Sequence, residues 1–296
     1  MSEVIYETNL PNLISRGKVR DSYDLGDRML IVASDRISAF DVVMKQPIPR
    51  KGEVLSQLSA FWFEKTAPLM PNHLIDAVND VSVLNKYFDD PPSYLAGRSM
   101  IVKKAKVIDI ECVVRGYISG SAWSSYKNTG LVNGIPLAPG LVESAPLVEP
   151  MFTPTTKATS GHDEPLTIEE MINKVGSDMT KQLIQHSVEI YTYAEQYARE
   201  LGIIIADTKL EFGMIDDKLI LVDELLTPDS SRFWEMSKYE PGHSQPSYDK
   251  QPVRDWLSQS GWNREPPAPK LPPEVVASTS RKYREAYERL TGKPLK

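Results

Sequence analysis

Two carboxylates at the end of an apolar segment are the residues of this sequence best placed to do chemistry. Asp223 and Glu224 follow the apolar run 219–222, and the polar segment 227–232 comes shortly after them. This pattern is typical of a buried strand that delivers polar groups to a cleft. A second strand pattern at 206–213 precedes the run, so a β-hairpin is predicted.

The register of this hairpin decides whether two carboxylates can share a cation. If residues 216–218 form a three-residue loop, Glu211 lies opposite Asp223, with about 5.5 Å between the Cβ atoms. Like charges this close repel unless a cation lies between them, and Mg²⁺ carried by a nucleotide fits oxygen ligands best. Lys209 would share that face and could reach a phosphate. A two-residue loop would instead place Glu211 opposite Val222, and an ordinary hairpin with solvated carboxylates is the alternative.

A basic loop near the N terminus could cover an anion. Gly17 lies between Arg16 and Lys18, with Arg20 close behind. A glycine lets backbone amides approach a phosphate while the cations surround it. A solvated turn is the alternative for so short a pattern.

A second anion site is predicted where a strand leads into a helix. Arg115 belongs to the strand expected at 109–117, and Ser121 directly precedes the helix expected at 122–128. The free N–H groups and the dipole of a helix N terminus favour an anion, and Arg115 could close its other side. A plain N-cap is the alternative for Ser121.

Two loops hold further candidate residues. The polar loop 34–41 contains Asp35 and Ser38. The proline-rich segment 134–165 contains Lys157, His162 and Asp163, and a loop this long inside a compact protein is usually functional or mobile.

The elements that must position these residues fall into two groups. An antiparallel-rich lobe with one helix is predicted for the first hundred residues, with a hairpin at 18–25 and 29–33, a helix at 53–66 and strands at 74–78 and 99–103. The pattern restarts near 105–108. Beyond it we expect the strand at 109–117, a capping-box helix start at Thr167, a long helix ending near Leu201, the hairpin, and a last helix at about 274–290.

The composition excludes several classes of protein. The 296-residue chain has a net charge of −6 and no dominant Lys or Arg run, which gives no sign of a nucleic-acid partner. One cysteine, Cys112, excludes an internal disulfide and a cysteine-based zinc site. No apolar stretch approaches the ~18 residues needed to span a bilayer, and the N terminus has no signal-peptide pattern, so we expect no membrane partner and a cytoplasmic protein. The motifs of Walker loops, dinucleotide-binding folds, serine hydrolases, zinc proteases and protein kinases do not occur.

Four motifs in order resemble one enzyme family. They are R-G-K-V-R-D from Arg16, E-C-V-V-R-G-Y-I-S-G-S from Glu111, D-T-K-L-E-F-G from Asp207 and D-E-L-L-T-P-D-S-S-R-F-W from Asp223. Together they resemble the phosphoribosylaminoimidazole-succinocarboxamide synthases, the SAICAR synthetases of de novo purine biosynthesis. The resemblance implies an ATP-dependent ligase that joins L-aspartate to carboxyaminoimidazole ribonucleotide (CAIR), giving the succinocarboxamide SAICAR, ADP and phosphate. It also implies a two-lobed α+β fold, with residues 1–106 as a small ATP-covering lobe, residues 107–296 as a larger α/β lobe that binds substrate and metal, and the ATP cleft between them.

The resemblance also implies a role for each candidate residue. For ATP and Mg²⁺, the residues are Gly17, Lys18, Arg20 and Lys103 around the nucleotide, with Glu211 and Asp223 holding the metal. For CAIR, Arg115, Ser121 and Arg232 would grip the 5′-phosphate. Lys209, between nucleotide and substrate, and Asp229, near the phosphate, are the candidate catalytic residues. The remaining substrate-binding candidates are Asp35, Ser38, Lys157, His162 and Asp163.

The expected reaction needs no protein nucleophile. Transfer of the γ-phosphoryl group to the substrate carboxylate would give an acyl phosphate, which the aspartate amine attacks. The protein would align two anions that repel each other and neutralise their charge. A small-molecule kinase with the same metal site is the alternative enzyme, and a non-catalytic nucleotide sensor is a third possibility.

Overall fold

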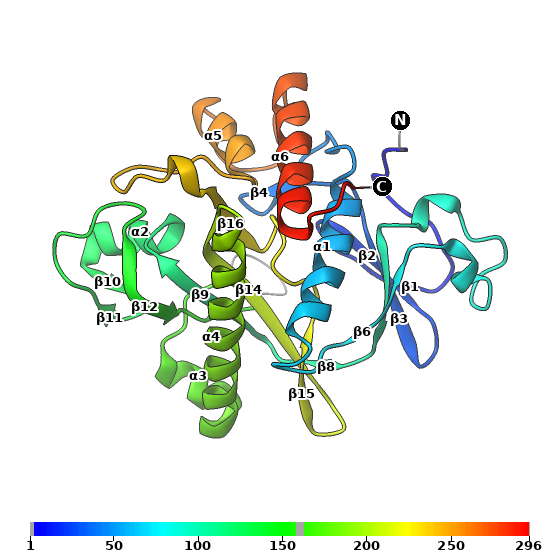
Figure 1. Cartoon of the computed structure of the whole chain (residues 1–296), viewed down its shortest axis with the longest axis horizontal. Helices are drawn as coiled ribbons and strands as arrows, with labels where there is room; N and C mark the ends of the chain where they lie inside the picture. The colour runs from blue at the N-terminus through cyan, green and yellow to red at the C-terminus, as the bar shows by residue number, and fades with distance from the viewer. Residues whose placement is uncertain (1–2, 158–162, 296) are drawn as a thin grey trace.

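Two antiparallel sheets form the framework of the protein (Figure 1). The structure is a computed structural model that describes residues 3–157 and 163–295. The smaller sheet has the strand order β1-β2-β3-β7-β6. Its strands are β1 (Leu13–Arg16), β2 (Arg20–Asp24), β3 (Arg28–Ala33), β7 (Ser99–Lys103) and β6 (Leu74–Val78).

The larger sheet is built around one long strand, β14 (Ile203–Ile215). Its path runs β12-β9-β14-β15, while β16 and β8 also pair with β14 and β13 pairs with β9. These strands are β12 (Pro146–Phe152), β9 (Ile110–Tyr117), β15 (Lys218–Val222), β16 (Ser231–Glu235), β8 (Lys106–Val107) and β13 (Thr155–Thr156). Two short hairpins complete the strands, β4 (Ser38–Ala39) with β5 (Val42–Val43) and β10 (Leu131–Val132) with β11 (Ile135–Pro136).

Helices pack on both sheets and join them. They are α1 (Lys51–Thr66), α2 (Gly120–Thr129), α3 (Ile168–Val175), α4 (Ser177–Glu200), α5 (Gln251–Gln259) and α6 (Pro273–Thr291), with short 3₁₀ turns at Val81–Leu84, Ser93–Leu95 and Met236–Lys238. Helix α4 packs on β14 and β9, and α6 packs beside α1 in the middle of the molecule (Figure 1). One hydrophobic cluster includes Val102 of the small sheet, Trp62 of α1 and Phe212 of β14. The two sheets therefore share a continuous core, because side chains of α1 fill the space between them.

The hairpin of β14 and β15 has the two-residue loop and not the three-residue loop from which we predicted a shared cation. Ile215 pairs with Lys218 and Glu211 pairs with Val222, so the loop contains only Asp216 and Asp217. Both loop residues have positive φ, 48° and 61°. A two-residue hairpin requires this conformation because its twist then matches that of the strands, and aspartate tolerates it better than most residues.

Most of the other predicted elements are confirmed. The first hairpin, the strands of β6 and β7, the helix α1, the strand β9 and the last helix all occur where the patterns placed them. The capping box at Thr167 is present in full. The N-cap of α2 is Ser119 instead of Ser121, so α2 begins two residues earlier than expected. The segment 134–165 is not the loop that we expected, because it contains β12 of the larger sheet and the short strands β11 and β13. Strands β1 and β16 and helix α5 were also not predicted.

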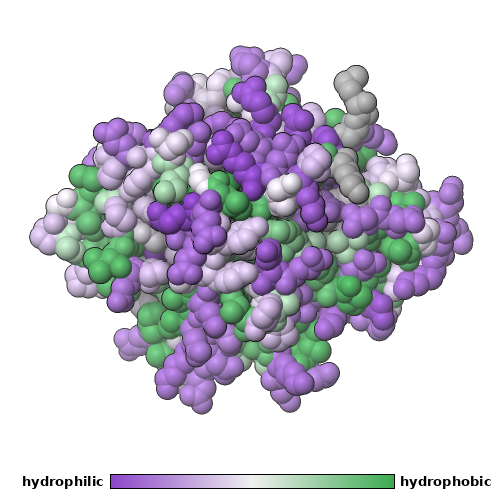
Figure 2. All heavy atoms as spheres, in the orientation of Figure 1, coloured by the Kyte–Doolittle hydropathy of each residue, from purple (hydrophilic) through white to green (hydrophobic). Residues whose placement is uncertain are grey.

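The surface seen in Figure 2 is mostly polar, with hydrophobic residues in small separate groups. In the part of the chain that the structure describes, no helix is both long and apolar enough to cross a membrane.

Candidate active site

A pocket of about 110 Å³ lies between the two sheets. Met29 and Ile31 of the small sheet line it on one side, and Ala105 and Val107 line it where the chain passes from one sheet to the other. The charged residues that line the pocket are Lys103, Lys157, Glu211 and Asp223. The pocket thus combines an apolar part with two carboxylates and two lysines. Three of these charged residues, Lys103, Glu211 and Asp223, are among our candidate residues for ATP.

Asp223 reaches this pocket although the strand register would have separated it from Glu211. β15 ends at Val222, and Asp223 has a φ of 67°, so the chain turns sharply there. That turn returns the Asp223 side chain to the side of Glu211, and both line the same pocket. The pKa of Asp223 is raised to about 6, because burial, together with the charges of Glu211 and Glu224, outweighs the opposing effect of Arg20. A carboxylate in this environment is stabilised by a cation.

Glu211 is held by two lysines. Lys209 Nζ lies 2.9 Å from Glu211 Oε1, and Lys157 Nζ contacts the other oxygen of the same carboxylate. Burial alone would raise the pKa of Glu211, but Lys209 and Lys157 outweigh it and lower the pKa to about 2. Lys209 also lies 2.5 Å from Oε1 of Glu111, which sequence reasoning did not single out. Burial would lower the pKa of Lys209, but Glu211 and Glu111 raise it, so this lysine stays charged.

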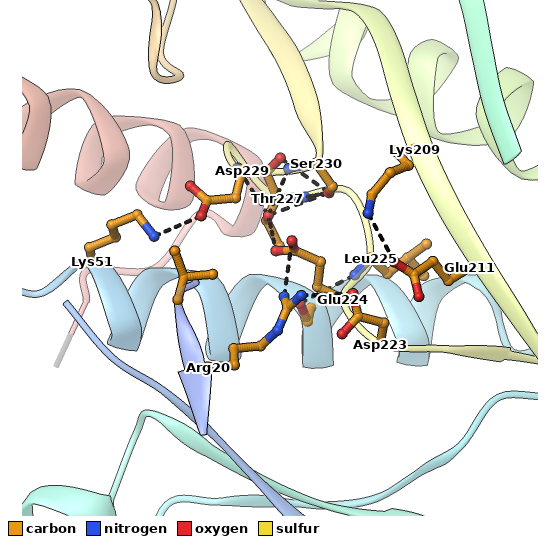
Figure 3. Close-up of polar contacts among 12 residues, drawn as sticks. Arg20, Lys51, Lys209, Glu211, Asp223, Glu224, Leu225, Thr227, Asp229 and Ser230 are labelled. Carbon is orange, nitrogen blue, oxygen red and sulfur yellow. Dashed lines mark hydrogen bonds and ion pairs between the residues drawn. The ribbon is translucent and has the colours of Figure 1, made fainter. Parts of the chain in front are cut away.

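Arg20 bridges the two neighbouring carboxylates at the end of the hairpin. Its Nη2 lies 2.7 Å from Asp223 Oδ2 and its Nη1 lies 2.9 Å from Glu224 Oε1 (Figure 3). Gly17 and Lys18 lie in the turn just before Arg20, where the Gly17 N–H donates to the Arg20 carbonyl at 2.7 Å and Lys18 pairs with Asp41 at 2.5 Å. The basic loop is therefore placed beside the pocket through Arg20.

Two arginines converge on one buried carboxylate at the other end of the site. Arg115 Nη1 donates to Asp207 Oδ2 at 2.9 Å, and Arg232 Nη1 donates to the same oxygen. Arg115 also donates to the Ser121 hydroxyl at 3.2 Å. A Cβ on Gly120 would lie 2.3 Å from Arg232 Nη2, and Gly120 has a φ of +56°, so only glycine fits at the start of α2. The predicted residues Arg115, Ser121 and Arg232 are thus brought together.

The long strand β14 connects these two groups. Asp207, Lys209 and Glu211 alternate along it, so their side chains lie on one face of the sheet. The neighbouring strand pairs Arg115 with Asp207, which places Glu111 beside Lys209. Glu111 lies four residues before Arg115 on β9, and therefore on the same face of the strand, which was the sequence signal that could have identified Glu111.

Other candidate residues lie elsewhere. The Asp35 carboxylate is fully buried and accepts hydrogen bonds from the N–H groups of Ile5 at 2.8 Å and Gly52 at 2.9 Å, so its place is structural and the expected contact with substrate is not supported. Ser38 is half-buried in β4. Asp163 is exposed, and its charge acts on Glu111. His162 lies outside the described residues.

Asp229 does not face the arginine pair as a catalytic residue would. Its carboxylate is buried and contacts Lys51 at 2.7 Å, the Tyr283 hydroxyl at 2.7 Å and Lys250 at 3.3 Å (Figure 3 shows the contact with Lys51). Burial, which raises the pKa of Asp229, is outweighed by Lys250 and Lys51, which lower it. A carboxylate with all these partners fixes the surrounding loop, and we assign it that role in place of the catalytic one.

The donor set fits a magnesium ion that arrives with a nucleotide. Mg²⁺ prefers oxygen ligands and is commonly bound by one or two carboxylates together with substrate phosphates. Glu211 and Asp223 provide two such carboxylates in one pocket. Among residues 3–157 and 163–295, no group of three or more His, Cys, Asp or Glu side chains forms a metal cage made of protein ligands alone.

The fold and the site define a two-lobed α+β protein with a pocket of lysines and carboxylates between its two sheets. Comparison with known proteins gives the family. The family model described as SAICAR synthetase matches residues 13–269. A phosphoribosylaminoimidazole-succinocarboxamide synthase of Thermodesulfovibrio yellowstonii is 52% identical over 297 residues, covering 98% of this chain and 100% of the relative. The chain therefore belongs to the SAICAR synthetase family, whose members are ligases.

Solved structures agree with this assignment. The SAICAR synthase of Saccharomyces cerevisiae, in complex with SAICAR, is 44% identical and superposes with a TM-score of 0.89 over 98% of this chain and 99% of that one. A SAICAR synthetase in complex with ADP is 24% identical, with a TM-score of 0.69 over 96% and 99% of the two chains, and shares the fold. The expected two-lobed α+β fold is confirmed.

Proposed function

We propose that this chain joins L-aspartate to CAIR with the consumption of ATP, giving SAICAR, ADP and phosphate. The assignment of the family supports this ATP-dependent ligation in purine biosynthesis. The observation that carries the proposal for this site is that Glu211 and Asp223 share one pocket, from which β14 leads directly to the arginine pair. A reaction of this kind takes place in the cytoplasm, where its substrates ATP, aspartate and CAIR are available.

ATP occupies the pocket between the sheets in this proposal. Residues 1–106 form the small lobe that covers it, and the apolar side chains Met29 and Ile31 contact the adenine ring. Glu211 and Asp223 hold Mg²⁺, which neutralises charge on the phosphates. Gly17, Lys18 and Arg20 cover the phosphates from above, and Lys103 adds a positive charge at the edge of the pocket. Arg20 exchanges its contact with Asp223 for the nucleotide, because a metal ion then neutralises that carboxylate.

CAIR binds at the other end of β14. Arg115, Arg232 and the Ser121 hydroxyl hold its 5′-phosphate beside the N terminus of α2, where the helix dipole favours an anion. Asp207 holds the two guanidinium groups in place by sharing one oxygen between them. This arrangement leaves Lys209, in the middle of the strand, between the ribonucleotide and the γ-phosphate.

Catalysis follows from alignment and charge neutralisation. Lys209 remains charged between Glu111 and Glu211, and it stabilises the negative charge that develops when the substrate carboxylate attacks the γ-phosphorus. ADP leaves as the acyl phosphate forms. The aspartate amine then attacks the acyl carbon, phosphate leaves, and the amine loses a proton as the amide forms. Holding the reactants in place can lower the barrier by roughly 7 to 11 kcal/mol. Lys157, Ser38 and Asp163 remain candidates for contacts with substrate.

An incubation with MgATP, CAIR and aspartate tests the proposal. We expect SAICAR and inorganic phosphate in equal amounts, and neither product when aspartate is replaced by succinate, which lacks the amine. Transfer of phosphate to a stable phosphorylated product would instead identify a kinase, and ATP binding without turnover would identify a nucleotide sensor.

A further inference from the structure

Three elements that are distant in the sequence converge on the carboxylate of Asp229. Lys51 is the first residue of α1, Lys250 directly precedes α5, and Tyr283 lies within α6. Lys51 contacts Asp229 Oδ2 at 2.7 Å, and the Tyr283 hydroxyl donates to Oδ1 at 2.7 Å. The Lys51 ammonium also lies 5.8 Å from the centre of the Tyr283 ring. Asp229 thus connects the loop that carries it to α1 in the N-terminal half and to α6 near the C terminus.

A buried group of charges of this kind is weak evidence for a role in stability. Lys51 is 0% exposed and Tyr283 is 0% exposed. Replacing such a buried ion pair with well-packed apolar side chains is often neutral or stabilising, because desolvation of the two charges opposes their attraction. A buried ion pair that also accepts a hydrogen bond from a hydroxyl group does, however, hold the backbone in one position, which apolar contacts do not. The loop that carries Asp229 needs a fixed backbone, because it leads to both proposed binding sites.

That loop, residues 223–232, runs from the proposed metal site to the proposed ribonucleotide site. Its first half has its own supports, because Glu224 is bound by Arg20 at 2.9 Å and by the Thr227 hydroxyl at 2.5 Å. Its second half leads into β16 and Arg232, and Asp229 is the residue there that connects to other helices. Figure 3 shows Lys51 beside Asp229 and Arg20 beside Glu224. Arg232 itself lies in β16, which pairs with β14. Loss of the second support would therefore loosen the residues directly before Arg232, while Asp223 keeps its own support.

Arg232 has little freedom to move. Its guanidinium is bound to Asp207 and lies so close to α2 that a single added carbon at Gly120 would overlap it. A displacement of the loop by a fraction of an ångström would break the geometry of the arginine pair, because hydrogen bonds to a phosphate depend on distance and angle.

We propose that Lys51 and Tyr283 are positioning residues for the ribonucleotide site and that they act through Asp229. Helix α6 lies beyond residues 13–269, which the family model matches, yet it supplies the Tyr283 hydroxyl. The helix thereby supports the site through Asp229. The inference rests on the proposed function, since it names what the loop positions.

The variant Tyr283→Phe tests this inference, because it removes only the hydroxyl. The matched control is Tyr197→Phe, which removes a hydroxyl that bonds to the Leu290 carbonyl of the same helix at 3.1 Å, away from Asp229. We expect Tyr283→Phe to raise the KM for CAIR about three- to tenfold, with the KM for ATP changed by less than twofold. The control is expected to change neither constant by more than twofold.

A second measurement does not depend on turnover. Hydrogen exchange of peptides that span residues 224–235 is expected to be faster in Tyr283→Phe than in wild type, and unchanged in Tyr197→Phe. Lys51→Met is expected to give a larger effect in the same direction. Equal exchange of this loop in the wild type and in a folded Tyr283→Phe would overturn the inference, as would an unchanged KM for CAIR. A wild-type protein that exchanges as expected but makes no SAICAR would instead refute the proposed function.

Discussion

The arginine pair allows a sharp test with the substitution Arg232→Lys. The guanidinium of Arg232 binds Asp207 through Nη1 while the rest of its planar fork lies along Gly120 at the start of α2. A lysine keeps the charge but has one ammonium in place of the fork, so it cannot hold Asp207 and a phosphate at the same time. One hydrogen bond between charged groups contributes about 1.5 to 3 kcal/mol, which corresponds to a roughly 10- to 150-fold weaker affinity for CAIR. The affinity for ATP should stay nearly the same.

Calorimetric titration of each ligand separates the two affinities. CAIR is titrated into the protein in the absence of ATP, and MgATP is titrated in a second experiment. Arg199→Lys is the control, because Arg199 is also paired with a carboxylate, that of Glu195 at 2.9 Å on α4. The control should bind both ligands like the wild type. An equal loss of both affinities in Arg232→Lys would show that the fold of the site, and not the grip on the ribonucleotide, depends on this residue.

Three further outcomes are expected. Asp223→Asn should abolish Mg²⁺-dependent turnover, and near-normal activity of this variant would remove Asp223 from the metal site. Because the pKa of Asp223 is raised to about 6, the affinity for MgATP should be constant above about pH 7. Below pH 6, where a proton competes with the metal, the affinity should fall by up to about tenfold per pH unit. Titrations between pH 5 and 8 would measure this profile, and a flat profile would contradict it. Gly120→Ala should weaken CAIR binding more than tenfold in the same calorimetric assay, since its Cβ would overlap Arg232; wild-type affinity would mean that the guanidinium can move aside.

Local patterns were sufficient for most of the framework. The alternation of β9, the capping box at Thr167 and the spacing of apolar residues in α1 each depend on neighbours within a few residues, and those elements were placed correctly. Helix α5 was missed because it has only nine residues, with a proline in its first turn and few apolar positions. β1 was missed because all four of its residues are exposed, which removes the alternation that marks a strand.

The hairpin shows why the site was harder to predict than the fold. Sequence alone allowed a two- or a three-residue loop, and the choice moves Glu211 from one face to the other relative to Asp223. The structure has the two-residue loop, but the positive φ of Asp223 places both carboxylates in one pocket. The expectation that a two-residue loop separates the two carboxylates was therefore wrong, because a single backbone angle beyond the end of β15 determines where the Asp223 side chain lies.

Some contacts between distant segments had no signal in the sequence. Lys51 and Asp229 are 178 positions apart, and Arg20 and Asp223 are 203 apart. Neither pair has a local signal, since any lysine or arginine on the small lobe could have served. The sequence motifs identify which residues belong to the site, while the tertiary structure determines which of them face a ligand and which hold others in place.

Asp207, Lys209 and Glu211 lie on the single strand β14, which fixes the distance between the two ends of the site. Peptide geometry fixes the span from Asp207 to Glu211 at roughly 13 Å, and no movement of one lobe against the other can stretch it. A residue inserted between Asp207 and Glu211 would place one of these two side chains on the opposite face of the sheet. Ribonucleotides whose phosphate and carboxylate are separated by a longer or shorter scaffold should therefore be rejected by length, whatever their charge.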